Sequence, residues 1–190
     1  MLENANGLAK IMLMLINAAL INNVVVTYFF GSELAVALKG DIKGSFKLGV
    51  SVSVMTITAA LVAYVLNSLV LIPLNAQYMQ LVCYILIVAA LLPVIKKVIK
   101  YDNEDFYTSV AINSAVIGLL FLNTEATFLD TILNTVFSSV GFITIMTLMA
   151  AVSQRLEDSN VFKGFKGVAI SLVSLGLVAL AFTGFNGLIK

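Results

Sequence analysis

Three asparagines inside apolar runs are the residues of this sequence best placed to build a polar site. Asn22 and Asn23 lie in residues 20–26, and Asn113 lies in residues 111–117, a near-copy of that segment 91 residues later. An amide loses its water in an apolar environment and needs hydrogen-bond partners from the protein. The duplication predicts two repeats of a membrane unit, whose interrupted helices meet near the bilayer midplane and form a site.

A simpler interpretation is that these amides only link neighbouring helices, each through a hydrogen bond contributing about 0.6 kcal/mol. For a single asparagine within a membrane span, that interpretation is preferable. Because the feature occurs twice, we favour the hypothesis that Asn22, Asn23 and Asn113 end broken helices at a functional centre.

Glu33 is the acidic side chain closest to the first pair of asparagines. One interpretation places it in water at the end of the first span. The other places it inside the membrane, where a charged group costs about 2.5–3.5 kcal/mol on insertion scales. A carboxyl group held there can carry a proton or bind Na⁺, so Glu33 is a candidate ion site.

Several kinds of chemistry have no support in this sequence. It contains one cysteine, Cys83, and no histidine, which excludes a disulfide framework, an ordinary zinc site and haem ligation through histidine. It has no phosphate-binding loop, dinucleotide fingerprint or catalytic triad. We assign no catalytic residue and no metal ligand, and any redox activity must draw on other subunits.

The composition is that of an all-α integral membrane protein. Of 190 residues, 61% are apolar and only 11% are charged, and the mean hydropathy is +1.05. One membrane domain covering residues 1–190 accommodates this length. Six apolar segments are each near the length of a membrane span: 8–30, 48–71, 78–95, 106–122, 128–153 and 168–189.

The basic residues predict the orientation of these six transmembrane helices. Nine of the eleven lie in the first, third and fifth connections, which the positive-inside rule assigns to the cytoplasm. Both termini of this multi-pass protein are then outside. With three spans in each half, residues of about 1–100 and 101–190 form two inverted three-helix repeats.

The first apolar stretch is too long for one straight helix. Residues 8–38 would extend about 46 Å as an α-helix, against about 30 Å of hydrocarbon. A break near Asn22 and Asn23, or a turn near Gly31 and Ser32, resolves the mismatch. By the duplication, we expect the fourth helix to be broken as well.

Six segments in register carry a family resemblance: 22–31, 71–75, 84–88, 113–118, 141–157 and 165–188. Through these segments the chain resembles the RnfA/NqrE-type membrane subunits over nearly its whole length. The resemblance implies a core subunit of a bacterial complex in the cytoplasmic (inner) membrane. Such a complex passes electrons between ferredoxin or a quinone and NAD(H), and couples this transfer to translocation of Na⁺ or H⁺.

The resemblance also implies partners and cofactors. The subunit pairs with a homologous six-span RnfE/NqrD-like subunit, and further subunits of the complex carry flavin and iron–sulfur centres. Two cysteines from each of the paired subunits hold a [2Fe–2S] cluster at their interface. In this chain the two cysteine positions are Glu33 and Ser114. Carboxylate and hydroxyl oxygens suit hard cations better than iron–sulfur clusters.

We therefore predict a membrane subunit of an Rnf/Nqr-like ion-translocating oxidoreductase that does not itself ligate a cluster. Two alternatives use the same scaffold. The first is a stand-alone transporter of a cation or small solute, and the second is a structural membrane anchor for a cytoplasmic partner. No feature of the sequence points to nucleic acid.

Overall fold

A computed structural model describes residues 7–37, 41–99, 104–124, 126–157, 159 and 162–187 of the 190-residue chain. Within these residues the structure is helical and contains no strand. The prediction of an all-α protein is therefore confirmed.

In the described part of the chain, three helices are long and apolar enough to cross a membrane. They are Ile42–Leu71, Gln77–Val98 and Phe128–Glu157. Shorter apolar helices cover Ala9–Ile21, Phe106–Leu122 and Val168–Thr183. The six helices coincide in position with the six predicted spans, but three of them have only 10–17 residues. The first and the fourth apolar segments are each interrupted at an asparagine.

The described chain divides into two compact units. Unit 1 combines Met1–Val50 with Phe137–Lys190, and unit 2 is Ser51–Val136. Both boundaries fall inside long helices, α4 (Ile42–Leu66) and α8 (Phe128–Glu157), so each of these helices contributes to both units.

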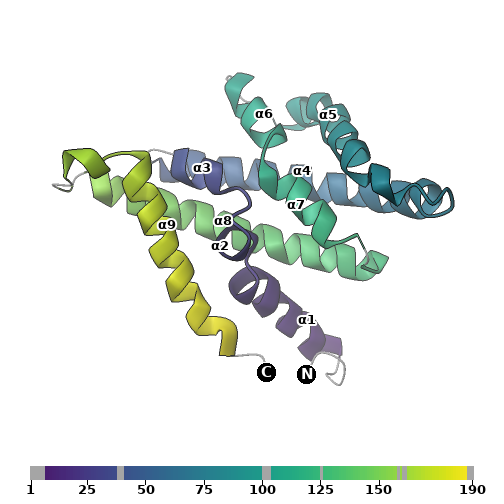
Figure 1. The fold of residues 1–190 in the computed structure, drawn as a ribbon, viewed down its shortest axis with the longest axis horizontal. Coiled ribbons are helices and arrows are strands. Elements are labelled where there is room, and N and C mark those ends of the chain that lie inside the picture. Colours follow the sequence, from purple (N-terminus) through teal and green to yellow (C-terminus); the bar gives the residue numbers. More distant parts are fainter. Residues whose placement is uncertain are drawn as a thin grey trace. The chain divides into compact units, whose positions relative to one another are not determined.

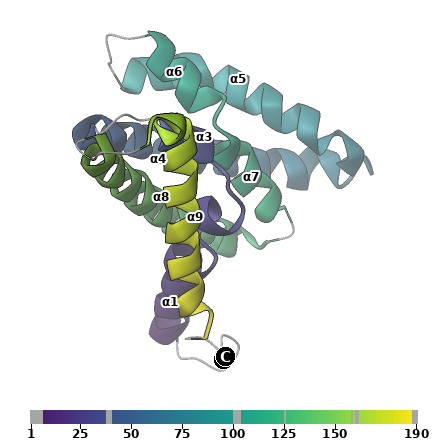
Figure 2. The same cartoon turned by 60° about the vertical axis from the view of Figure 1, so that its left-hand side comes forward.

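Unit 1 is built around the interrupted first segment and the last α-helix, α9 (Val168–Thr183). The segment comprises α1 (Gly7–Ile16), the π-helical turn η1 (Asn17–Ile21), α2 (Val24–Thr27) and α3 (Ser32–Ala37). Helix α9 packs against η1, α2 and α3. Two 3₁₀ turns flank α9, η4 (Lys163–Phe165) and η5 (Gly184–Gly187). Figures 1 and 2 show the beginning of α1 and the end of α9 at the same end of this unit.

Apart from Lys10 in α1, the described basic residues of unit 1 gather at its other end. Lys43 and Lys47 lie in the first turns of α4, Arg155 lies in the last turn of α8, and Lys166 precedes α9. Figure 1 shows these three helix ends together on the left. This arrangement agrees with the predicted segregation of positive charge within unit 1. Lys39 and Lys100, which belong to the same prediction, lie outside the described residues.

Unit 2 is built around α5 (Gln80–Val98), which packs against α6 (Glu104–Ala111) and α7 (Ser114–Leu122). Figures 1 and 2 show α5 and α6 side by side. The end of α4 continues into a second π-helical turn, η2 (Asn67–Leu71), and the 3₁₀ turn η3 (Gln77–Met79) leads into α5.

Helices α4 and α8 bury corresponding positions 90 residues apart. The buried positions follow the three- and four-residue spacing of one helix face. At nearly every position where α4 buries a residue, α8 buries the residue at that offset. The pairs include Ser45 and Thr135, Leu48 and Ser138, Val52 and Phe142, Met55 and Ile145, Thr56 and Met146, Ala59 and Met149, Ala60 and Ala150, and Ala63 and Ser153. Ser53 is an exception, because Ile143 is only half-buried.

Candidate functional site

Asn23 caps the first helix after the break in unit 1. Its backbone is extended, with φ −62° and ψ 127°, and its side-chain oxygen accepts a hydrogen bond of 3.0 Å from the Val25 amide. Its Nδ2 donates a hydrogen bond of 2.8 Å to the Ala19 carbonyl oxygen in the preceding π turn. Asn23 is 0% exposed. One buried amide therefore begins α2 and also fastens it to the helix that ends before the break.

Asn113 has the same role at the break in unit 2. Its backbone, with φ −63° and ψ 123°, matches that of Asn23, and its side-chain oxygen accepts a hydrogen bond of 2.7 Å from the Ala115 amide at the start of α7. Asn113 is 1% exposed, and its Nδ2 has no hydrogen-bond partner among the described residues. The two caps are thus equivalent, whereas the two amide nitrogens are not.

Asn22 does not share this role. It is exposed, and its Nδ2 donates a hydrogen bond of 2.9 Å to Oδ1 of Asn17, one turn earlier. The equivalent caps are Asn23 and Asn113, 90 residues apart, rather than the 91 that the repeated sequence indicates. A π turn contains about one residue more than an α turn, so the residue after Asn22 reaches the cap position.

A second irregularity follows α2. Phe29 and Gly31 have positive φ values of 59° and 79°, and α3 begins at Ser32. Both of the alternatives predicted for the overlong first segment are therefore present: a break at Asn22 and Asn23 and a turn at Gly31. Glu33 lies exposed in the first turn of α3, within unit 1. Its role as an ion site stays a prediction.

Gly141 of α8 permits close contact at the first break. A methyl group on Gly141 would lie 2.6 Å from Asn23 Nδ2, 2.8 Å from the Ala19 oxygen and 2.9 Å from Ala19 Cα. These distances are shorter than van der Waals contact, and two of the three atoms belong to backbone. Helix α8 therefore approaches the Asn23–Ala19 hydrogen bond as closely as glycine allows.

The residues at the two family cysteine positions do not fit a [2Fe–2S] cluster. Glu33 offers a carboxylate in unit 1, and Ser114, the half-buried first residue of α7, offers a hydroxyl in unit 2. Cys83 is half-buried in α5 and matches neither position. Iron–sulfur clusters are held by thiolates, so this donor set is a poor one for the cluster that the resemblance implies.

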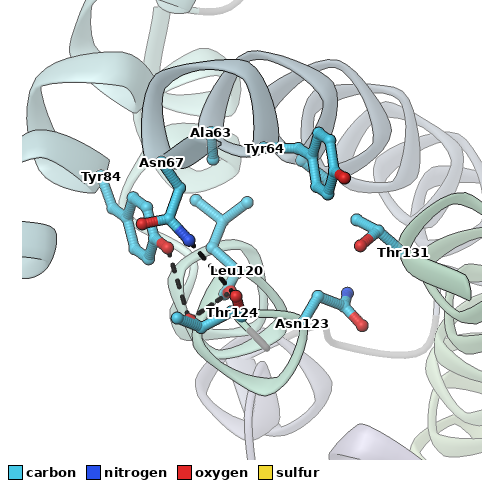
Figure 3. A pocket seen from close by; sticks show the side chains of 9 residues that line it. Ala63, Tyr64, Asn67, Tyr84, Leu120, Asn123, Thr124 and Thr131 are labelled. Carbon is cyan, nitrogen blue, oxygen red and sulfur yellow. Dashed lines mark hydrogen bonds between the residues drawn. The ribbon is translucent and has the colours of Figure 1, made fainter. Parts of the chain in front are cut away.

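Sequence reasoning missed a polar network at the other end of α7, in unit 2. Asn67 Nδ2 donates to the Thr124 carbonyl oxygen (3.2 Å), and Gln80 Nε2 donates to Asn67 Oδ1 (3.3 Å). The Tyr84 hydroxyl lies 3.3 Å from the Thr124 hydroxyl. Figure 3 shows Asn67, Tyr84 and Thr124 of this group around a pocket. The sequence contains a signal for this network, because the polar pair Asn123 and Thr124 directly follows the apolar segment 106–122.

The helices, their interruptions and their apolar surfaces define an α-helical membrane protein with broken spans. Residues 11–189 match the family described as Rnf-Nqr subunit, membrane protein. The chain therefore belongs to the Rnf-Nqr family of membrane subunits, and the resemblance noted in the sequence is confirmed.

Individual relatives agree with this assignment. The A-subunit of the Na(+)-translocating ferredoxin:NAD(+) oxidoreductase complex of Acetobacterium woodii is 32% identical over 183 residues, covering 92% of this chain and 95% of the relative. The A-subunit of the ion-translocating oxidoreductase complex of Erwinia tasmaniensis is 32% identical over 192 residues, covering 96% and 100%. That of Aeromonas hydrophila subsp. hydrophila is 30% identical over 192 residues, also covering 96% and 100%.

Proposed function

We propose that this chain is a membrane subunit of an Rnf/Nqr-type complex that couples electron transfer to translocation of Na⁺ or H⁺. The observation that carries the proposal is similarity to the A-subunits of ion-translocating oxidoreductase complexes over nearly the whole chain. The geometry supports it, because two interrupted helices with matching asparagine caps are the device by which membrane transporters place polar backbone within the bilayer.

The internal repetition supports two inverted three-helix repeats. The broken segment of the first half packs against α9, the third helix of the second half, within unit 1. The broken segment of the second half packs against α5, the third helix of the first half, within unit 2. Each unit therefore combines the broken segment of one half with the third helix of the other half. The matched burial of α4 and α8 follows the same 90-residue offset.

In this proposal the chain supplies the scaffold and the partners supply the redox groups. It pairs with a homologous RnfE/NqrD-like subunit in the bacterial inner membrane, with both termini outside. Flavin and iron–sulfur centres belong to other subunits, because Glu33 and Ser114 stand where cluster cysteines are expected. We expect the two breaks, at Asn23 and Asn113, to meet near the centre of the bilayer.

The test is affinity purification of the tagged chain from its native membrane in a mild detergent. We expect a homologous six-span subunit and flavin- and iron–sulfur-containing subunits to co-purify. We also expect vesicles that contain the assembly to take up ions when NAD(H) is oxidised or reduced. A stable homodimer without those subunits would contradict the proposal and favour a stand-alone transporter.

Glu33→Gln tests the ion-handling part of the proposal separately. Replacing the carboxylate with an amide of similar size removes the charge and the capacity to carry a proton. We expect electron transfer to continue while ion uptake is lost. Unchanged ion uptake by the Glu33→Gln assembly would remove Glu33 from the ion path without affecting the assignment to the complex.

A further inference from the structure

Unit 2 contains two pockets that the proposed function does not yet use. The wider one, the amide chamber, has a volume of about 320 Å³, and its walls include Tyr64, Asn67, Gln80 and Thr124. The narrower one, the recess, has a volume of about 10 Å³, and its walls combine apolar side chains with polar ones that include Thr131. Tyr64, Asn67 and Thr124 line both pockets, so the recess adjoins the amide chamber.

The recess holds a buried hydroxyl with no described partner. Thr131 is 3% exposed, and its Oγ1 has no hydrogen-bond partner within the described part of the chain. Figure 3 shows its side chain turned toward the recess, opposite Asn67 and Thr124. A space of about 10–15 Å³ is enough for one water-sized species. The hydroxyl thus lies beside a space that matches one small polar ligand.

The hydrogen bonds around the recess leave oxygen acceptors for a ligand. The Thr124 hydroxyl donates to the Leu120 carbonyl oxygen at 3.3 Å, so the Tyr84 hydroxyl must donate to Thr124 Oγ1. The Thr124 carbonyl oxygen accepts one hydrogen bond, from Asn67 Nδ2, and Asn67 Oδ1 accepts one, from Gln80 Nε2. Each of these two oxygens, like the Thr131 hydroxyl oxygen, therefore retains a lone pair that a ligand can use.

A second network fixes the amide on the other side of the recess. The Thr135 hydroxyl donates to the Thr131 carbonyl oxygen at 2.7 Å, so Asn123 Nδ2 donates to Thr135 Oγ1 at 3.0 Å. Asn134 Nδ2 donates to Asn123 Oδ1 at 2.7 Å. This chain of bonds leaves one orientation for the Asn123 amide and holds the wall in place.

The helix end at this site favours positive charge. Asn123 is the C-cap of α7, so the recess lies beside the negative end of the α7 dipole. No charged residue is among the described residues that line the chamber or the recess. Divalent Ca²⁺ and Mg²⁺ are bound in proteins with carboxylate ligands, whereas neutral hydroxyl, amide and carbonyl oxygens suit a hard cation of single charge.

We propose that the recess binds one monovalent cation of the size of Na⁺, with Thr131, Asn67 and Thr124 supplying oxygens. The amide chamber admits the cation with part of its water, and the recess replaces that water with protein oxygens. The inference rests on the proposed function, since it gives the translocated ion a binding place in this chain.

Thermal unfolding of the purified full chain, together with the subunits that co-purify, tests this site without relying on activity. We expect NaCl to raise the melting temperature of the wild type more than choline chloride at equal ionic strength. Thr131→Val removes the hydroxyl at nearly constant volume, and it should raise the half-saturating Na⁺ concentration about tenfold or more. Thr131→Ser keeps the hydroxyl and should behave as the wild type.

Thr144→Val is the matched control. Thr144 lies on the same helix, is exposed, and donates its hydroxyl to the Val140 carbonyl oxygen at 2.8 Å. It should leave the response to Na⁺ unchanged.

Equal stabilisation of the wild type by NaCl and choline chloride would overturn the site and indicate water alone in the recess. An unaltered Na⁺ response in Thr131→Val would also overturn it. If Thr131→Val does not fold, the wild-type comparison of the two salts still decides. Na⁺ binding by a chain that purifies without partner subunits would contradict the proposed function and retain the site.

Discussion

The two helix breaks differ in how completely each satisfies its own asparagine. Asn23 and Asn113 have nearly identical backbone angles, and each accepts a hydrogen bond from the amide two residues later. Asn23 also donates to the Ala19 carbonyl oxygen, whereas Asn113 Nδ2 has no partner in the described structure. The two breaks therefore share the N-cap hydrogen bond, and they differ in whether the asparagine Nδ2 has a partner.

The cause of the difference is local. The helix before Asn23 ends in a π turn, whose spacing brings the Ala19 carbonyl within reach of the side chain. The helix before Asn113 ends without a π turn. The comparison teaches that the first break is closed by its own chain, while the second retains a buried donor that another element can use.

The largest expected effect comes from Gly141→Ala, which tests how tightly the first break is packed. The added methyl group would lie within 3 Å of Asn23 and the Ala19 backbone, so one of these segments must move. We expect destabilisation of about 3 kcal/mol, seen as a lower melting temperature in detergent. Gly176→Ala in α9 is the control, because no atom lies within 4 Å of its added methyl group. Equal melting temperatures for the two variants would show that α8 is not close to the break.

Serine substitution at the two caps sharpens the comparison. Serine is as good an N-cap as asparagine, but its short side chain cannot reach back to the preceding helix. Asn23→Ser should cost about 1–3 kcal/mol, because the Ala19 carbonyl loses its buried donor. Asn113→Ser should cost about 0.5 kcal/mol or less, because it keeps the cap and removes an amide nitrogen without a described partner. An equal decrease in melting temperature for both variants would show that the hydrogen bond from Asn23 Nδ2 does not make the first break more sensitive than the second.

Asn113→Ala tests what the two breaks have in common. Alanine removes the side-chain acceptor for the Ala115 amide, and loss of an N-cap costs about 1 kcal/mol. Thermal unfolding should therefore rank Asn113→Ala clearly below Asn113→Ser. Equal melting temperatures for the two variants would show that the Asn113 cap does not contribute to the stability of unit 2.

The smallest effect is expected for Asn22→Ala. Asn22 is exposed and hydrogen-bonds only to Asn17 among the contacts of its side chain in the structure. Surface substitutions of this kind change stability by about 0.5 kcal/mol or less. A loss as large as that of Asn23→Ser would show that Asn22, as the sequence repeat indicates, is the true counterpart of Asn113.

The sequence predicted the positions of the six apolar helices and both breaks, because hydropathy and intramembrane asparagine report directly on burial. It did not predict which asparagine forms the first cap, since the π turn that shifts the register depends on packing around Ala19 and Gly141. It also missed the network around Asn67 and the recess beside Thr131, whose residues come from helices far apart in sequence. Glu33, predicted as a candidate ion site, lies exposed, and its role stays a prediction.

Cross-linking between the two breaks tests the central claim most directly, namely that both belong to one polar centre. Asn22 is exposed and Ile112 is 74% exposed, so Asn22→Cys and Ile112→Cys in a Cys83→Ala background offer two accessible thiols beside the caps. Val168→Cys with Leu172→Cys, one helical turn apart on α9, is the positive control. A short bis-maleimide should join the first pair within one chain as readily as the control pair. Reaction of the control pair alone would place the two breaks apart and contradict the account.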